Sequence, residues 1–395
     1  SVASRGLGDV YKRQGLDTSL NTLMVGETAS NVAIRKCEIK RCKQQIGDTV
    51  FAVGIIVQCG SSNVLIDDCY IHDIDASITG IARGIIGSGY GTTATHFYNL
   101  IIQNSTFANV SPNTDGDAIC FQPDDLTQNI DSSVINCKFT NCQKRAIKIQ
   151  GNNVSVIGGT ITLPTAGYAG ISVYANNCRV IGTIMTNGYA EHGVDIQGNS
   201  TIIDGINVEM TSQSTNDGVR AYNTCNDIVV SNCVLKTLRT GIRFSNTGTR
   251  ATVTGNSIYN TTQVGVYNVG VSGTYMNQVS VVGNNFGTIG TYTVRNEGGT
   301  QWSAIGNVSD GTGLGSHANL PTRSTYIGNL IAGQSTEATG TAIPTTGTWS
   351  QGDKVYKNSP VEAGIAGSKY VIIGWICTVA GTPGTWLEMR TLTGN

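Results

Sequence analysis

The side chains best suited to acid–base chemistry gather in one stretch of the chain. Only 13% of its 395 residues are charged, yet carboxylates, guanidinium groups and a histidine recur there at short intervals. The members of this group are Glu191, His192, Asp195, Asp217, Arg220 and Arg243. Such a mixture suits the cleavage of sugars, in which one group donates a proton, a second accepts one and cations hold the substrate.

Glu191 and Asp217 are the candidates for the two carboxylates of a glycoside hydrolase, acting as general acid and as base or nucleophile. Retaining enzymes separate these groups by about 5–5.5 Å and inverting enzymes by about 6.5–9.5 Å. His192 would tune their proton affinity, and Asp195 is a third candidate. A polysaccharide lyase would use the same residue types differently, with a base that removes a proton beside a uronate carboxylate and a cation that stabilises the developing charge.

Basic and aromatic side chains nearby are the candidates for substrate binding. Arg220 and Arg243 suit the carboxylate of an acidic sugar. The full set is Arg220, Arg243, Lys148, Tyr174, Tyr222, Asp117 and Arg145. Two other interpretations stay open: the charges form a ladder that merely solvates an outer face, or the face binds sugar without cleaving it.

A repeat over residues 144–270 would position these side chains. The same pattern of two short alternating runs, broken by Gly and Asn, recurs with its first aliphatic residue at Ile147, Ile171, Val194, Val219 and Ile242, at intervals of 24, 23, 25 and 23 residues. Alternation predicts strands, and so steady a period predicts stacked coils that share one interior. We therefore predict an all-β right-handed parallel β-helix of about ten coils over residues 31–309. Equivalent positions of successive coils would stand about 4.8 Å apart, so the charged residues would form columns on one outer face.

The remaining segments have other roles in this interpretation. Residues 1–14 are basic and unpatterned, and they resemble translated sequencing-adaptor carry-over of metagenomic assemblies. In this interpretation the true start of the protein is missing. Residues 15–30 are predicted to form a lead-in strand or the end of a preceding domain. Residues 75–97 and 122–132 are predicted as projecting loops. Residues 310–321 form a linker, and residues 322–395 a small β-domain whose three tryptophans form either a core or sugar-stacking platforms.

Composition excludes several classes of function. A net charge of −1 without a basic run disfavours nucleic acid as a partner. No apolar run approaches the roughly 20 residues that cross a membrane, and we predict no signal peptide. The eleven cysteines lack C-x-x-C spacing and recur at shared positions of the coils, which favours interior thiols and folding in a reducing cytoplasm. We predict no cofactor and no metal, although Asp124 and Asp125 could offer oxygens to calcium.

At these motifs the chain resembles the pectin-lyase-like superfamily of right-handed parallel β-helices. Residues 113–116 read NTDG and residues 192–193 read HG, as in polygalacturonase-type glycoside hydrolases, and Arg220 is similar to the arginine of their RIK box. The rung where that family carries paired aspartates holds Arg145 here, and Tyr222 replaces the lysine of RIK.

A closer likeness is to phage tailspike and tail-fibre depolymerases, through the DAI and RAIKIQ strands and the segments GTWSQGDKVYKNSP and IGWICTVAGTPGTW. This resemblance implies a homotrimer on a virion tail, folded in the host cytoplasm, that binds and often cleaves surface polysaccharide extracellularly. We predict a polysaccharide depolymerase, with hydrolysis favoured over β-elimination. The alternatives are a receptor-binding or structural tail protein without catalysis, and a secreted bacterial pectinase-like enzyme that would be a monomer.

Overall fold

The computed structural model describes most of the chain. The described residues are 21–43, 52–76, 80–89, 96–125, 127–163, 167–186, 188, 190–211, 216–245, 247–270, 273–309, 325–327, 330–331, 337–347 and 349–394. All regular elements in these ranges are β-strands, and the same ranges hold no helix long and apolar enough to span a membrane. The predicted lead-in before residue 21 and the predicted adaptor-like tract lie outside them.

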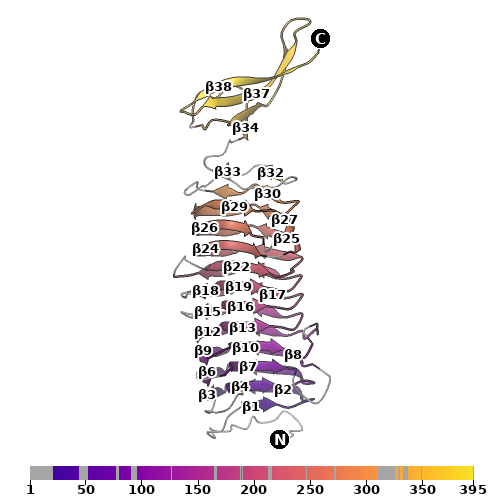
Figure 1. Cartoon of the computed structure of the whole chain (residues 1–395), viewed down its shortest axis with the longest axis vertical. Helices are drawn as coiled ribbons and strands as arrows, with labels where there is room; N and C mark the ends of the chain where they lie inside the picture. The colour runs from indigo at the N-terminus through magenta and orange to yellow at the C-terminus, as the bar shows by residue number, and fades with distance from the viewer. Residues whose placement is uncertain are drawn as a thin grey trace.

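The strands wind into a solenoid with three faces, on each of which strands of successive coils pair in parallel (Figure 1). Face 1 consists of β1 (Asn21–Val25), β4 (Ala52–Val57), β7 (Ala82–Ser88), β10 (Gly116–Gln122), β13 (Arg145–Ile149), β16 (Ala169–Val173), β19 (His192–Ile196), β22 (Asp217–Tyr222), the second halves of β24 (Val234–Ser245) and β26 (Ser257–Asn268), and β29 (Tyr292–Asn296). Face 2 consists of β2 (Ser30–Arg35), β5 (Ser62–Asp67), β8 (Tyr98–Gln103), β11 (Ser133–Ile135), β14 (Ser155–Ile157), β17 (Arg179–Ile181), β20 (Ile202–Asp204), β23 (Ile228–Ser231), β25 (Thr249–Thr254), β27 (Asn277–Val282), β30 (Ser303–Ile305) and β32 (Thr325–Ile327). Face 3 consists of β3 (Glu38–Lys40), β6 (Tyr70–Ala76), β9 (Thr106–Pro112), β12 (Lys138–Cys142), β15 (Thr160–Thr162), β18 (Ile184–Thr186), β21 (Asn207–Glu209), the first halves of β24 and β26, β28 (Asn285–Ile289), β31 (Val308–Ser309) and β33 (Leu330–Ile331).

The interior of the solenoid is a set of aliphatic stacks. The predicted repeat positions pair in register, Ile147 with Ile171 and Val194 with Val219, and all of them are buried. Beside this stack Gly193 faces inward, where a Cβ atom would lie 2.5 Å from the Gly218 carbonyl oxygen. Only glycine permits so close an approach of two coils. The predicted solenoid is therefore confirmed, and its register fixes the outer columns of face 1.

An asparagine ladder links the second residues of three successive strands of face 2. The Asn63 amide donates to Asn31 Oδ1 at 3.1 Å, and the Asn99 amide donates to Asn63 Oδ1 at 2.8 Å. The three residues lie in β2, β5 and β8. All of them have positive φ angles, a conformation that asparagine tolerates better than most residues.

The structure differs from the predicted segmentation in three places. Strand β1 pairs in parallel with β4, so the coil pattern begins before residue 31. Strand β7 lies inside residues 75–97, which were predicted as a projecting loop, because its seven buried residues complete a coil of face 1. Strands β32 and β33 pair with β30 and β31, so the coil pattern continues beyond residue 309 into the stretch assigned to the C-terminal domain. The eleven cysteines are all free thiols, nine of them buried, as expected.

The C-terminal residues form a separate sheet. It consists of β34 (Glu337–Gly340), β35 (Lys354–Lys357), β36 (Glu362–Ala363), β37 (Tyr370–Val379) and β38 (Thr385–Leu392). Trp375 and Trp386 are buried against Val355 and Cys377, and Trp349 packs edge-on against Trp386 at 5.1 Å. Of the two roles left open for the tryptophans, the structure supports the core.

Candidate functional site

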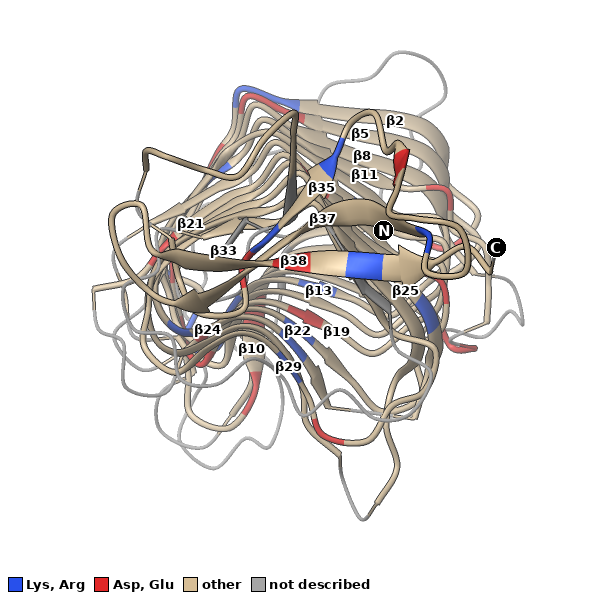
Figure 2. Cartoon of the chain, turned by 90° about the horizontal axis from the view of Figure 1, so that it is seen from above, with Lys and Arg blue, Asp and Glu red and all other residues tan. Residues whose placement is uncertain are grey.

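The charged residues of face 1 form the predicted columns. Asp195 pairs in register with Ser172 and Arg220, and Arg220 with Arg243. His192 pairs with Asp217 in the neighbouring column. Seen along the solenoid in Figure 2, the charged positions of β13, β19, β22 and β29 lie on the same side of the molecule. We call this surface the charged face.

Asp217 is the centre of one cluster on the charged face. Its carboxylate is fully buried, and Arg239 Nη2 donates to both oxygens, at 2.7 and 2.8 Å. Arg243 Nη1 and His192 Nδ1 each lie 3.5 Å from Asp217 Oδ2. Burial alone would raise the pKa of Asp217, but the contacts with His192 and Arg239 outweigh it and lower that pKa. Asp217 is therefore an ionised carboxylate beneath two guanidinium groups.

Glu191 is the exposed carboxylate of the same cluster. Its side chain is 59% exposed, and Oε2 lies 3.8 Å from His192 Nε2. The imidazole ring thus touches Glu191 through one nitrogen and Asp217 through the other, which keeps the two carboxylates within the ~10 Å span used by glycosidases. Neither ring nitrogen has a hydrogen-bonding partner of good geometry among the described residues, although the ring is buried.

Asp195 organises a second cluster. Its carboxylate is fully buried and accepts hydrogen bonds from Arg220 Nε at 2.7 Å, the Tyr168 hydroxyl at 3.0 Å and the Gln197 amide at 3.0 Å. The guanidinium of Arg220 also donates to the Tyr168 hydroxyl and lies 4.8 Å from the centre of the Tyr222 ring. Burial, followed by the charge of Asp195, raises the pKa of Tyr168. Tyr168 is therefore a neutral phenol within this network.

A third cluster surrounds Asp115 and the buried Asp117. Arg145 Nη1 lies 2.7 Å from Asp115 Oδ1 and 3.1 Å from Asp117 Oδ1, and Lys148 Nζ lies 3.2 Å from Asp115 Oδ2. Arg83 approaches both carboxylates, at 3.7 and 3.8 Å. Lys148 also lies 5.8 Å from the centre of the Tyr174 ring. Because three cations here face two carboxylates, this cluster carries a positive excess.

The structure brings the predicted residues together in these three groups. Glu191, His192, Asp217 and Arg243 share the first, Asp195, Arg220 and Tyr222 the second, and Lys148, Tyr174, Asp117 and Arg145 the third. The carboxylates of Asp117, Asp195 and Asp217 are buried, and the cations that contact them lie between them and the solvent.

Five residues of the clusters were not predicted as site residues. They are Arg83, Asp115, Tyr168, Gln197 and Arg239. Tyr168 and Arg239 stand in the same column of the repeat as Glu191, and this shared position is the signal that could have identified them.

Possible calcium ligands at Asp124 and Asp125 find no support. Asp125 Oδ1 instead accepts hydrogen bonds from the Thr127 amide and hydroxyl, at 2.9 and 2.8 Å. Within the described ranges no group of three or more His, Cys, Asp or Glu residues could hold a metal ion.

Comparison with known proteins identifies the architecture. A family model described as the right-handed beta helix region matches residues 126–286. The protein is a right-handed parallel β-helix. A search of curated protein sequences finds no match to this β-helix.

Several solved structures are similar to this chain over most of its length. The A-module of a mannuronan C-5 epimerase from Azotobacter vinelandii is 16% identical, with 72% of this chain and 91% of that chain covered and a TM-score of 0.42. A mutant tailspike protein of E. coli bacteriophage HK620, in complex with a pentasaccharide, is 14% identical, with 79% and 56% covered and a TM-score of 0.49. Tailspike protein 3 of bacteriophage CBA120 is 13% identical, with 95% and 63% covered and a TM-score of 0.36.

Asp115 should make the stability of the β-helix depend on pH in the acid range. Burial alone would raise its pKa, but Arg145 and Lys148 lower it to about 2. An unfolded aspartate titrates near pH ~3.9, so the stabilisation is complete above about pH 4 and is lost as the pH falls towards about 2. In urea unfolding across this window, we expect the free energy of unfolding of Asp115→Asn to fall less steeply than that of the native protein. Parallel curves for the two proteins would contradict the assignment, since the other carboxylates are the same in both.

Proposed function

We propose that the charged face binds an acidic or other surface polysaccharide and cleaves its glycosidic bonds by hydrolysis. The protein would then act as a depolymerase of the phage-tailspike kind. The observation that carries the proposal is the pairing of an exposed carboxylate, Glu191, with an ionised one, Asp217, on the two nitrogens of the His192 ring. Its tail context, its extracellular place of action and its assembly as a homotrimer rest on the sequence resemblance and are part of the proposal.

In this proposal Glu191 is the general acid, because it is the member of the pair that a substrate can reach directly. Asp217 stays ionised and serves as base or nucleophile once the substrate displaces Arg239 from it. His192 contacts both carboxylates and helps to lower the pKa of Asp217, and Asp195 holds Arg220 in place. Two carboxyl groups in different roles beside one bond are what acid–base cleavage of a glycoside requires.

The cations and tyrosines of the charged face would bind the sugar chain. Arg220, Arg243 and Lys148 are each partly exposed while a buried or half-buried carboxylate fixes them. A guanidinium held in this way loses little conformational freedom when it binds a carboxylate or a hydroxyl pair. The rings of Tyr174 and Tyr222 offer apolar surface to the faces of sugar rings.

A second candidate is a spike that binds polysaccharide without cleaving it. The observation that favours it is the complete burial of Asp195 and Asp217 beneath arginines. Carboxylates in such a position orient the cations that contact them, and oriented cations with tyrosines suffice for binding.

Incubation with capsular, pectic and other acidic polysaccharides tests the proposal. New reducing ends without absorbance of unsaturated uronates are the expected result. Both signals together would mean β-elimination and would replace the hydrolytic roles given above. Binding with no product across the panel would overturn cleavage in favour of the binding spike.

A further inference from the structure

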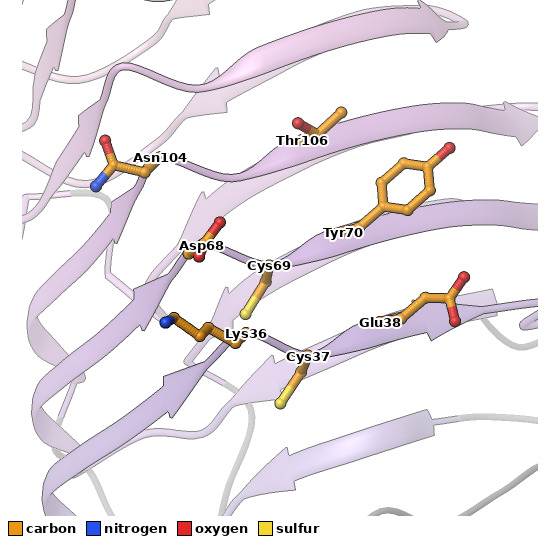
Figure 3. A pocket seen from close by; sticks show the side chains of 8 residues that line it. All are labelled: Lys36, Cys37, Glu38, Asp68, Cys69, Tyr70, Asn104 and Thr106. Carbon is orange, nitrogen blue, oxygen red and sulfur yellow. The ribbon is translucent and has the colours of Figure 1, made fainter.

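A hollow lies where faces 2 and 3 meet in the first described coils, on a different part of the surface from the charged face. Its volume is about 590 Å³. The residues that line it, labelled in Figure 3, are Lys36, Cys37, Glu38, Asp68, Cys69, Tyr70, Asn104 and Thr106. Two free thiols, Cys37 and Cys69, stand side by side in it.

The two cysteines occupy equivalent positions on adjacent coils. Glu38 pairs in register with Tyr70, and the Tyr70 amide donates to the Cys37 carbonyl oxygen at 2.8 Å. Adjacent strands lie about 4.8 Å apart, and a disulfide joins Cα atoms that are about 4.4–6.8 Å apart. The backbone of the native coils therefore already has the spacing that a disulfide needs.

The side chains are also suitably placed. The Cys69 sulfur points toward the coil that carries Cys37 (Figure 3), where it lies 3.6 Å from the Ile34 carbonyl oxygen. The Cys37 sulfur lies 3.2 Å from the Arg35 carbonyl oxygen of its own coil, and its side chain is half-buried. Formation of the bond requires the Cys37 side chain to turn away from the Arg35 carbonyl oxygen and toward Cys69.

No other cysteines share this arrangement in the described coils. Cys137 stacks between Ser105 and Gly159, and Cys233 stacks between Ile206 and Asn256. Their thiols are buried and donate to backbone carbonyl oxygens. Among the described cysteines, Cys37 and Cys69 are therefore the pair that both stack on adjacent coils and line a hollow open to solvent.

We propose that Cys37 and Cys69 are an oxidation site that forms a disulfide between two coils when the folded protein meets a low-molecular-weight disulfide. The Cys37 thiolate attacks that reagent and releases one small thiol, leaving a mixed disulfide. The Cys69 thiolate then attacks the Cys37 sulfur and releases the second small thiol. The protein loses two electrons and two protons, and the reagent gains both. Burial raises the pKa of the Cys69 thiol, so the second step is faster at alkaline pH.

The cross-link would join two successive coils. Among the described strands, β2 pairs with β5 and β3 with β6. Each coil of a solenoid is held mainly by contacts with its neighbours. A covalent bond from β3's coil to the next one opposes the separation of the two coils after the protein has left a reducing compartment.

Treatment of the folded protein with glutathione disulfide at mildly alkaline pH, followed by intact mass and peptide mapping, tests the inference. We expect a mass lower by two hydrogen atoms, a Cys37–Cys69 peptide pair, and slower hydrogen exchange in β3 that dithiothreitol reverses. Cys37→Ser and Cys69→Ser should each abolish the cross-link, whereas Cys42→Ser, which removes the other half-buried thiol, should leave it intact.

Two results would overturn the inference. One is a stable glutathione adduct on Cys37 without loss of the second glutathione, which would mean that Cys69 cannot reach it. The other is an unchanged mass. Either result is independent of whether the charged face cleaves polysaccharide.

Discussion

Replacing Glu191 by glutamine is expected to slow polysaccharide cleavage by roughly 10²–10⁴-fold, the usual contribution of a positioned general acid. Glutamine keeps the shape of the side chain but has no proton to give at neutral pH. Glu191 is 59% exposed, and its ionic contact among the described residues is with His192 at 3.8 Å, so the folded structure should be unchanged. The measurements are the rate of new reducing ends and the melting temperature on the same sample.

Glu209→Gln is the matched control for this variant. Glu209 is a similarly exposed glutamate, 41% at the side chain, on face 3 and pairs with Lys236 at 2.7 Å. Both substitutions remove one surface charge, but only Glu191 belongs to the charged face. Equal rates for the two variants would remove Glu191 from the role of acid, whereas a loss in Glu191→Gln with unchanged binding would separate catalysis from recognition.

The columns of the charged face could be predicted because a solenoid converts sequence period into spatial position. Once Ile147, Ile171 and Val194 align, every residue at a fixed offset from them occupies a known place. The predicted neighbours Asp195 and Arg220 are in register and form an ion pair at 2.7 Å. The register of strand pairing in a parallel sheet fixes which residues of successive coils are neighbours.

The degree to which the carboxylates of Asp195 and Asp217 are buried could not be predicted in the same way. Alternation predicts that Asp195, which follows the inward Val194, points out of the solenoid. Neither this rule nor the charge of Asp217 predicts that long side chains from adjacent coils fold over the two carboxylates. Arginine and tyrosine reach across several ångströms through rotatable bonds, and the sequence does not say which way they turn. The burial of both aspartates is a result of side-chain packing above the sheet.

Arg239 was not predicted as a site residue, although it stands in the same column of the repeat as Glu191. It lies in β24, which runs without a break from Val234 to Ser245 and shifts register with β26 between Leu238 and Thr240. The repeat predicts the position of its backbone on the outer face but not the direction of its side chain. The guanidinium group of Arg239 donates to both oxygens of Asp217 on the preceding coil.

Asp195→Asn is expected to lower the free energy of unfolding by about 3–5 kcal/mol, the usual cost of leaving a buried charge without its partner. The substitution keeps the volume of the side chain, but the guanidinium of Arg220, which is 15% exposed, would lose its counter-ion. The amide group of the introduced asparagine would also face donors from Tyr168 and Gln197. Urea unfolding of both proteins measures this difference.

Asp227→Asn tests whether the loss of unfolding free energy expected for Asp195→Asn comes from the burial of its ion pair or from ion pairing alone. Asp227 accepts from Arg250 Nη2 at 2.8 Å, but the two side chains are 44% and 59% exposed. Water screens such a pair, so Asp227→Asn should cost no more than about 1 kcal/mol. Asparagine also tolerates the positive φ of 59° at this position. If the two variants lost equal stability, the buried network around Asp195 would contribute no more than a surface ion pair. The rigid placement of Arg220, on which the proposed sugar binding depends, would then have no energetic basis.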